Sequence, residues 1–243
     1  MYKRIILKLS GETLAPETFS PEQKKKSLTF DAARVDRAAD AIVRLHDLGV
    51  QVGVVMGGGN IWRGRTSIFI GIEQAQGDYM GMLGTVINAL AVQSALEENG
   101  LACRVMSSIN VPQVCEPYYR RKALSHLDKG IVVIFAGGTG NPYCTTDSCA
   151  ALRALEIDAD AILMAKNGVD GVYTADPRKN PEAKKIEQIT YHDLISNQLA
   201  VMDLTAAAML ETKNVPIHVF SMDDPKAFEK VLSGEKVGTV IKD

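Results

Sequence analysis

Short apolar runs recur along the chain, separated by longer segments in which apolar residues return every three or four positions. The short runs predict strands, and they are continuously apolar rather than alternating, as strands buried on both faces are. They cover residues 4–10, 51–58, 103–108, 130–138, 161–167, 217–221 and 238–242. Strands that alternate with helices predict an α/β fold, with a parallel sheet covered by helices on both faces.

Four segments between the strands have the periodicity of amphipathic helices. In the longest, Tyr79, Leu83, Val86 and Leu90 fall on one face, and an exposed apolar face of this helix is a candidate subunit contact. Residues 15–30 contain two prolines and three consecutive lysines and predict an exposed loop. The helices are expected over residues 30–48, over 78–99, from Thr145 or Thr146 to residue 156, and over 200–214.

Composition narrows the class of protein. The 243 residues are 46% hydrophobic and 23% charged, as in ordinary soluble proteins. The net charge of −2 argues against a nucleic-acid or membrane partner, because both attract basic surfaces. No stretch is expected to span a membrane, and the apolar start is too short for a signal peptide. The four cysteines form no CxxC pair or zinc-like set, which favours reduced thiols in a cytoplasmic protein.

Glycine-rich turns follow three of the predicted strands. They are residues 10–11, residues 57–59 and the stretch AGGTGNPYCTTD at 136–147. The carboxyl ends of parallel strands meet at one edge of a sheet, where ligands bind. Backbone N–H groups without side chains in front of them bind anions, and a helix start adds positive potential. The three turns therefore predict a phosphate-binding edge.

Charged side chains near these turns are candidates for chemistry. Lys8 lies in an apolar strand, so its ammonium either reaches a charged partner at the sheet edge or emerges from an edge strand into solvent. Arg63 can bind phosphate oxygens through its guanidinium fork. Asp147 lies in the first turn of a predicted helix, where a carboxylate suits the helix dipole whether or not it has a further role. Asp78 is either a site residue or an N-cap.

Two familiar nucleotide-binding motifs fit the chain poorly. A P-loop is rejected because Arg65 stands where its lysine belongs and no convincing helix follows. A dinucleotide fingerprint is weakened because Tyr143 occupies the place of the third glycine. The turn-rich run 166–181 supplies Tyr173 and Asp176, which either hold a purine nucleoside or form an ordinary turn.

Taken in order, six stretches resemble the amino-acid kinase superfamily and, within it, the bacterial uridylate kinases. They are YKRIILKLSGE, VGVVMGGGNIWRG, GDYMGMLGTVINALA, AGGTGNPYCTTD, AKNGVDGVYTADPRK and VMDLTAAAM. The resemblance implies a three-layer αβα sandwich with a mainly parallel central sheet. It implies one domain over 1–243, with an acceptor half at roughly 1–150 and an ATP half at roughly 151–243. The implied reaction is direct in-line phosphoryl transfer from ATP to UMP, in pyrimidine nucleotide biosynthesis.

The resemblance also implies roles for individual residues. The catalytic residues would be Lys8, Arg63, Asp147 and Asp203. ATP would contact Lys8, Leu9, Ser10, Gly11, Gly59, Arg63, Asn167, Tyr173 and Asp176. UMP would contact Gly58, Asp78, Thr139, Gly140, Asn141, Pro142, Tyr143, Cys144, Thr145 and Thr146. Mg²⁺ would arrive with ATP rather than occupy a metal site of the protein.

Regulation and assembly follow from the same resemblance. It implies a homohexamer and an allosteric enzyme that responds to GTP and UTP, although residues 13–30 replace a shorter glycine-rich segment of relatives. Three other functions stay open: a superfamily kinase that acts on a carboxylate or carbamate, a non-catalytic nucleotide-binding protein, and a dinucleotide-dependent oxidoreductase. The joint presence of Lys8, Arg63 and Asp147 favours a kinase.

Overall fold

The computed structural model describes residues 2–16, 29–166, 168–175, 177, 180, 182–197, 199, 201–222, 224 and 226–243. Within these residues, nine strands form one sheet. In order across the sheet they are β4 (Glu116–Pro117), β3 (Cys103–Ser107), β5 (Val132–Ala136), β2 (Gln51–Met56), β1 (Arg4–Leu9), β6 (Ala161–Lys166), β10 (Ile217–Ser221), β11 (Thr239–Ile241) and β9 (Gln188–Ile189). Neighbouring strands pair in parallel except β10 with β11, so the sheet is mainly parallel.

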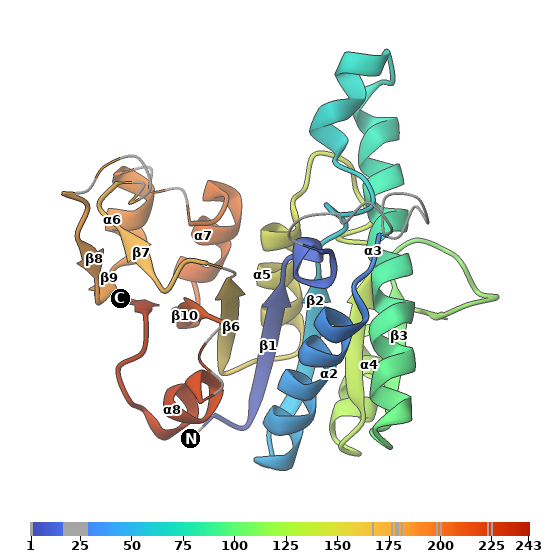
Figure 1. Ribbon diagram of the computed structural model, residues 1–243, viewed down its shortest axis with the longest axis horizontal. Coiled ribbons are helices and arrows are strands. Elements are labelled where there is room, and N and C mark those ends of the chain that lie inside the picture. The colour runs from blue at the N-terminus through green and yellow to red at the C-terminus, as the bar shows by residue number, and fades with distance from the viewer. Residues whose placement is uncertain are drawn as a thin grey trace.

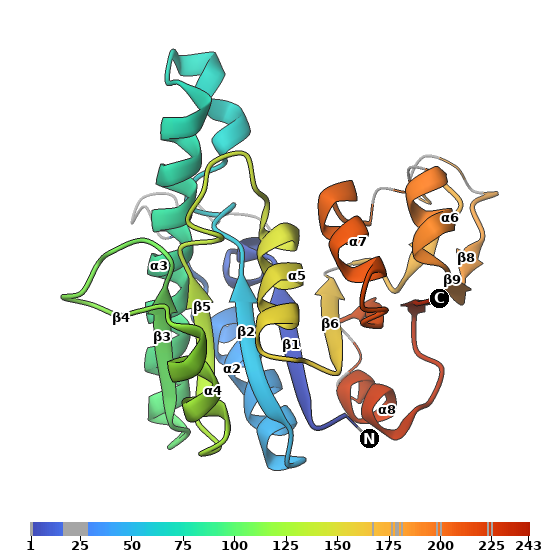
Figure 2. The same ribbon diagram turned by 180° about the vertical axis from the view of Figure 1, so that it is seen from behind.

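Helices cover both faces of this sheet, as the two opposite views show (Figures 1 and 2). One face carries α2 (Ala32–Asp47), α3 (Gln74–Glu98) and α8 (Ala227–Ser233), and the other carries α4 (Arg120–Leu127), α5 (Thr146–Glu156), α6 (Tyr191–Ser196) and α7 (Leu204–Glu211). Ile5 and Leu7 of β1 pack into the first layer, whereas Ile6 packs into the second. This alternation is the two-residue period of a strand buried on both faces, and it confirms the three-layer αβα sandwich.

The predicted strands are all present, and the predicted start of α5 is confirmed. Thr145 is its N-cap, with its hydroxyl accepting hydrogen bonds from the backbone of Asp147 and Ser148. Helices α4, α6 and α8 were not predicted, and neither were β4, β9 or the separate antiparallel pair β7 (Val172–Tyr173) and β8 (Lys185–Ile186).

Helix α3 differs from its prediction in two respects. It begins at Gln74 with Glu73 as the N-cap, so Asp78 lies inside the helix and does not cap it. The apolar face is only partly buried, because Val86 is 4% exposed but Tyr79 is 41% and Leu83 46% exposed. Apolar residues occur on nearly all sides of α3, and the side that packs against the sheet includes Ala89, Val92 and Leu96. By length and composition alone α3 could cross a membrane, contrary to expectation, but half of its most apolar stretch is buried inside the protein.

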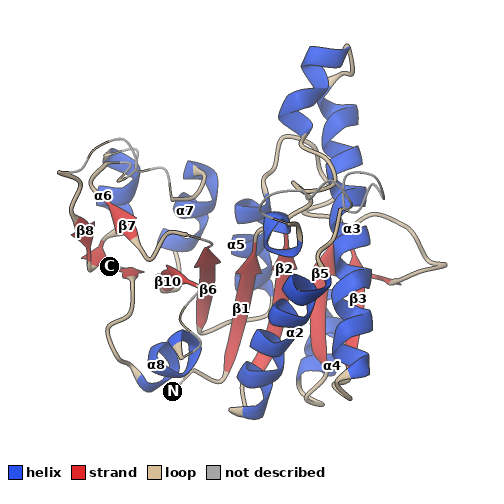
Figure 3. Ribbon diagram, in the orientation of Figure 1, coloured by secondary structure: helices blue, strands red, loops and turns tan. Residues whose placement is uncertain are grey.

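Two short 3₁₀ helices follow the first and second glycine turns. They are η1 (Gly11–Leu14) and η2 (Gly64–Ile70). A P-loop requires an α-helix after its glycines, so η2 agrees with the rejection of that motif. The three turns follow β1, β2 and β5, which pair in parallel and run toward the same, upper edge of the sheet in Figure 3, so the glycine turns come together there.

Candidate functional site

The first and second glycine turns pack directly on each other. A Cβ atom on Gly11 would lie 2.5 Å from the carbonyl oxygen of Gly57, so a larger residue does not fit. That carbonyl also accepts a hydrogen bond of 2.7 Å from Nδ2 of Asn88 in α3. The turns after β1 and β2 therefore form one surface, fixed from the side by a buried amide.

The third glycine turn, defined here as residues 137–143, is shaped by left-handed backbone. Gly137, Gly138 and Gly140 have φ values of 73°, 56° and 83°, which suit glycine. Side chains of α3 hold both of its ends. The hydroxyl of Thr85 accepts from the N–H of Gly137 at 2.8 Å, and the Asp78 carboxylate accepts from the N–H of Tyr143 at 2.9 Å.

The start of α5 is tied to the start of α7 through Asp203. Its Oδ1 accepts from the N–H of Ala206 at 2.8 Å, so Asp203 is the N-cap of α7. Its Oδ2 accepts from the hydroxyls of Thr145 and Ser148, the latter at 3.0 Å. Asp203 thus has a helix-capping role and, in addition, positions the amino end of α5.

Lys8 reaches the carboxyl edge of the sheet. Its Nζ lies 2.7 Å from Oδ1 of Asp147, and the two side chains are only 16% and 18% exposed. Because β1 lies in the middle of the sheet, the alternative of a lysine emerging from an edge strand is wrong. The pair joins a central strand to the first turn of α5, where the helix dipole is positive.

A second lysine, which sequence reasoning missed, lies beside this pair. Lys166 ends β6, and its Nζ donates to the carbonyl oxygen of Val201 at 2.9 Å. Burial, and then the charge of Lys8, lower the pKa of Lys166, while Asp147 acts in the opposite direction. Lys166 could have been found by the same signal as Lys8, because it too is a lysine at the end of an apolar run.

Thr146, the residue before Asp147, lines a hollow of about 390 Å³, called here the α3–α5 hollow. Its lining includes most residues predicted to hold the acceptor: Gly58, Asp78, Thr139, Asn141, Tyr143, Cys144, Thr145 and Thr146. Gly140 packs instead against Ser108, and Pro142 is outside the lining. Gly59, predicted on the ATP side, lines this hollow. Trp62 and Thr85 also line it and were not foreseen, because nothing in their local sequence marks them.

Arg63 and Tyr173 are not among the residues that line the hollow. Arg63 is 60% exposed and pairs with Glu12, while its Nε donates to the carbonyl oxygen of Gly59 at 3.4 Å. The hydroxyl of Tyr173 donates to Asp170 at 2.7 Å on the β7–β8 pair. Asn167 and Asp176 lie outside the described residues, as do the three lysines of the 15–30 segment.

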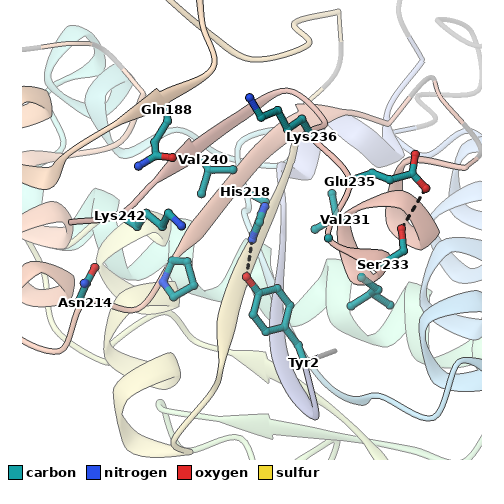
Figure 4. Close-up of a pocket in the computed structure, with 13 residues that line it drawn as sticks. Tyr2, Gln188, Asn214, His218, Val231, Ser233, Glu235, Lys236, Val240 and Lys242 are labelled. Carbon is teal, nitrogen blue, oxygen red and sulfur yellow. Dashed lines mark hydrogen bonds between the residues drawn. The ribbon is translucent and has the colours of Figure 1, made fainter.

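A larger hollow, of about 570 Å³, opens at the opposite edge of the sheet (Figure 4). It is called here the His218 hollow, and it is lined by Tyr2, His218, Lys236, Val240 and Lys242, among others. The Tyr2 hydroxyl lies 2.8 Å from Nε2 of His218. Burial, and to a smaller extent the charge of Lys242, lower the pKa of His218 to about 4, so this imidazole is neutral at pH 7.

A mainly parallel α/β sheet with three glycine turns and a lysine–aspartate pair at its carboxyl edge is typical of proteins that bind the phosphate groups of nucleotides. The sequence profile described as the Amino acid kinase family matches residues 3–221. The chain belongs to this family. The predicted resemblance to its superfamily is thereby confirmed.

Relatives within the family are similar over nearly the whole chain. A uridylate kinase of Pediococcus pentosaceus is 48% identical over 99% of this chain and 97% of its own length. A uridylate kinase of Limosilactobacillus reuteri is 50% identical with the same coverage. Among solved structures, a UMP kinase of Bacillus anthracis has a TM-score of 0.93 at 42% identity, with 100% of this chain and 96% of that chain covered. A UMP kinase of Ureaplasma parvum has a TM-score of 0.90 at 36% identity, with both chains fully covered.

Proposed function

We propose that this chain transfers the terminal phosphoryl group of ATP to UMP and forms UDP and ADP. The observation that carries the proposal is the identity of 48–50% to uridylate kinases over 99% of the chain. The geometry agrees with it. Thr146 lines the α3–α5 hollow, and the next residue, Asp147, holds Lys8. An acceptor in the hollow would therefore have its phosphate beside the ammonium of Lys8.

The chemistry suits the residues at this edge. The attacking oxygen of UMP is already ionised, so no general base is needed, and the task is to bring two polyanions together and neutralise the moving charge. Lys8 and Lys166 supply positive charge, and the amino end of α5 adds its dipole. Asp147 keeps the Lys8 ammonium in place between the strand and the helix.

Each nucleotide has a proposed set of contacts. The acceptor is held by Asp78, by the third glycine turn and by Thr145 and Thr146. The ATP phosphates are held by residues 8–11 with Gly59 and Arg63, and the adenosine by Asn167, Tyr173 and Asp176. On this proposal the acceptor half covers roughly residues 1–150 and the ATP half roughly 151–243.

Mg²⁺ is the proposed cofactor, bound mainly through the phosphates of ATP. Within the described part of the chain, no three His, Cys, Asp or Glu side chains gather in a metal-binding group. The carboxylate of Asp147 is the hard oxygen ligand of the kind that Mg²⁺ prefers at this edge. When bound, the ion supplies charge neutralisation for the transferring group.

Assembly and location complete the proposal. Tyr79, Leu83 and Ile87 expose 41–46% of their surface along one face of α3, and Phe69 of η2 is 88% exposed. An apolar surface of this kind is typical of subunit contacts, so we propose a homo-oligomer, with the hexamer implied by the resemblance as the expected state. The four free cysteines agree with a reducing compartment, and the proposed location is the cytoplasm.

A coupled assay for ADP formation tests the proposed reaction. Purified protein with Mg·ATP is offered UMP, CMP, glutamate or carbamate as the acceptor. We expect ADP and UDP to form in equal amounts with UMP, and no turnover with glutamate or carbamate. Turnover only with a carboxylate or carbamate would assign a different kinase of the same superfamily. Absence of turnover with every acceptor would favour a nucleotide-binding protein.

A further inference from the structure

Arg153, in the middle of α5, is a charged side chain in the core that the proposed mechanism does not use. It is 3% exposed. Its guanidinium carbon lies 3.8 Å from the centre of the Tyr118 ring, and its Nη1 pairs with the carboxylate of Glu156. The Tyr118 hydroxyl donates to the same carboxylate at 2.6 Å. Burying such a pair gains little stability over apolar packing, so stability alone does not account for an arginine here.

The other end of the guanidinium points to the strand edge. Nη2 of Arg153 donates to Oγ of Ser108 at 2.8 Å, and Oγ of Ser108 lies 2.8 Å from the carbonyl oxygen of Gly138. A guanidinium has no acceptor, so Ser108 must accept from Arg153. The single hydroxyl hydrogen is then directed to Gly138. The three groups form a one-way chain of hydrogen bonds that begins on a full positive charge.

Ser108 contacts the third glycine turn twice. Besides its hydrogen bond to Gly138, it packs so close to Gly140 that a Cβ added there would lie 3.2 Å from the Ser108 Cβ. Thr85 and Asp78, which also bond to the turn, both come from α3. Ser108 holds the turn from the sheet side, between them. Arg153 in turn fixes the rotamer of Ser108.

We propose that Arg153 is a positioning residue for the acceptor nucleotide. Through Ser108 it holds the third glycine turn in the shape that binds the acceptor, without itself lining the α3–α5 hollow. This inference rests on the proposed function for the identity of the acceptor. It predicts that loss of the Arg153 chain weakens acceptor binding and leaves ATP binding and the Lys8–Asp147 pair unaffected.

Three variants test it. Arg153→Met keeps the volume and removes the donors, and Ser108→Ala removes the middle link with little risk to folding. Arg120→Met is the control, because Arg120 is an exposed arginine of α4 that pairs with Asp158 and bonds the backbone of Glu156, not the turn. We expect KM for UMP to rise about three- to tenfold in both Arg153→Met and Ser108→Ala, the range of a lost hydrogen bond, because each change breaks the same chain. KM for ATP is expected to stay within about twofold in all variants, since no ATP contact is removed.

The double variant sharpens the test. Both single changes break the same chain, so the double variant is expected to resemble either single variant rather than show the product of both effects. A purely structural Arg153 would lower Tm in Arg153→Met and leave KM for UMP unchanged in both single variants, and this result would overturn the proposal. So would full additivity of the two changes.

Hydrogen exchange gives a readout that does not depend on the acceptor. In the free protein, the amides of residues 137–143 are expected to exchange several-fold faster in Arg153→Met and Ser108→Ala than in the wild type or Arg120→Met. Unchanged exchange in both variants contradicts the positioning role. Faster exchange in a protein that does not phosphorylate UMP would support the positioning role and reject the proposed acceptor.

Discussion

Two hollows lie at opposite edges of the same sheet, and the larger one is not the proposed site. The α3–α5 hollow measures about 390 Å³ and the His218 hollow about 570 Å³. The smaller is lined by glycine turns and the start of α5, and the Lys8–Asp147 pair lies beside it. The larger is lined by strand flanks and the end of α8, and Lys236 on its rim is already paired with Glu187.

The difference shows that volume alone does not mark a phosphate site. What distinguishes the α3–α5 hollow is its left-handed glycines, the amino end of α5 on its wall and the partly buried cations Lys8 and Lys166 near it, each of which suits an anion. In the His218 hollow the central imidazole is neutral at pH 7 and engaged with Tyr2. The two edges should therefore respond differently to substitution, the first in turnover and the second in stability.

The largest expected effect belongs to Lys8. Lys8→Ala should lower kcat about 10²–10³-fold, as removal of one group that stabilises transition-state charge does in other enzymes, and should change KM for UMP much less. The matched control is Lys242→Ala in the His218 hollow, which should keep wild-type kcat. Steady-state kinetics with UMP measures both. Near-normal turnover in Lys8→Ala, or an equal loss in Lys242→Ala, would remove the distinction between the two edges.

A smaller effect is expected at Asp78, which holds one end of the third glycine turn. Asp78→Ala removes the acceptor of the Tyr143 N–H and should raise KM for UMP about tenfold. Asp78→Asn keeps a side-chain oxygen and should raise it less. KM for ATP serves as the internal control. If both nucleotides lost affinity equally, Asp78 would act on the fold rather than on the acceptor.

The smallest effect on activity is expected at His218, where the effect is on stability. The pKa of His218 is about 4 in the folded protein, against an ordinary value of 6.5. Between pH 6.5 and pH 4, His218 is therefore protonated in the unfolded chain but neutral in the folded protein. The free energy of unfolding should therefore decrease over this interval, by up to about 3 kcal/mol from this residue.

The substitution His218→Gln removes this titration. Urea unfolding at pH 7.5 and at pH 4.5 should show a smaller acid-induced loss in the variant than in the wild type, with kcat and KM unchanged at pH 7.5. An identical loss in both proteins would show that other groups cause the acid sensitivity.

The sequence predicted those elements whose signal lies within a few neighbouring residues. Buried parallel strands are continuously apolar and were predicted, and the N-cap at Thr145 marked the start of α5. Helix α4 was not predicted because its eight residues bury only Ala123 and Leu127, too few to show a period. An exposed apolar face of α3 could be suggested from the sequence, but which residues form it could not, because the helix is apolar on nearly all sides.

In the candidate site, too, contacts between residues that are distant in sequence could not be predicted from spacing. Lys8 could be singled out as a lysine in an apolar strand, but its partner Asp147 is distant in sequence, so only the family resemblance, and no spacing, could suggest that Asp147 orients Lys8. The chain from Arg153 to Gly138 joins α5, the end of β3 and the third glycine turn. No spacing in the sequence marks such a contact, because each link depends on how the layers pack.

The most direct measurement is a crystal structure with UMP and a non-hydrolysable ATP analogue. We expect the UMP phosphate against Thr145 and Thr146 in the α3–α5 hollow, and the terminal phosphate of the analogue within hydrogen-bonding distance of the Lys8 ammonium. A nucleotide bound in the His218 hollow instead, or phosphates that both lie away from Lys8, would contradict the account.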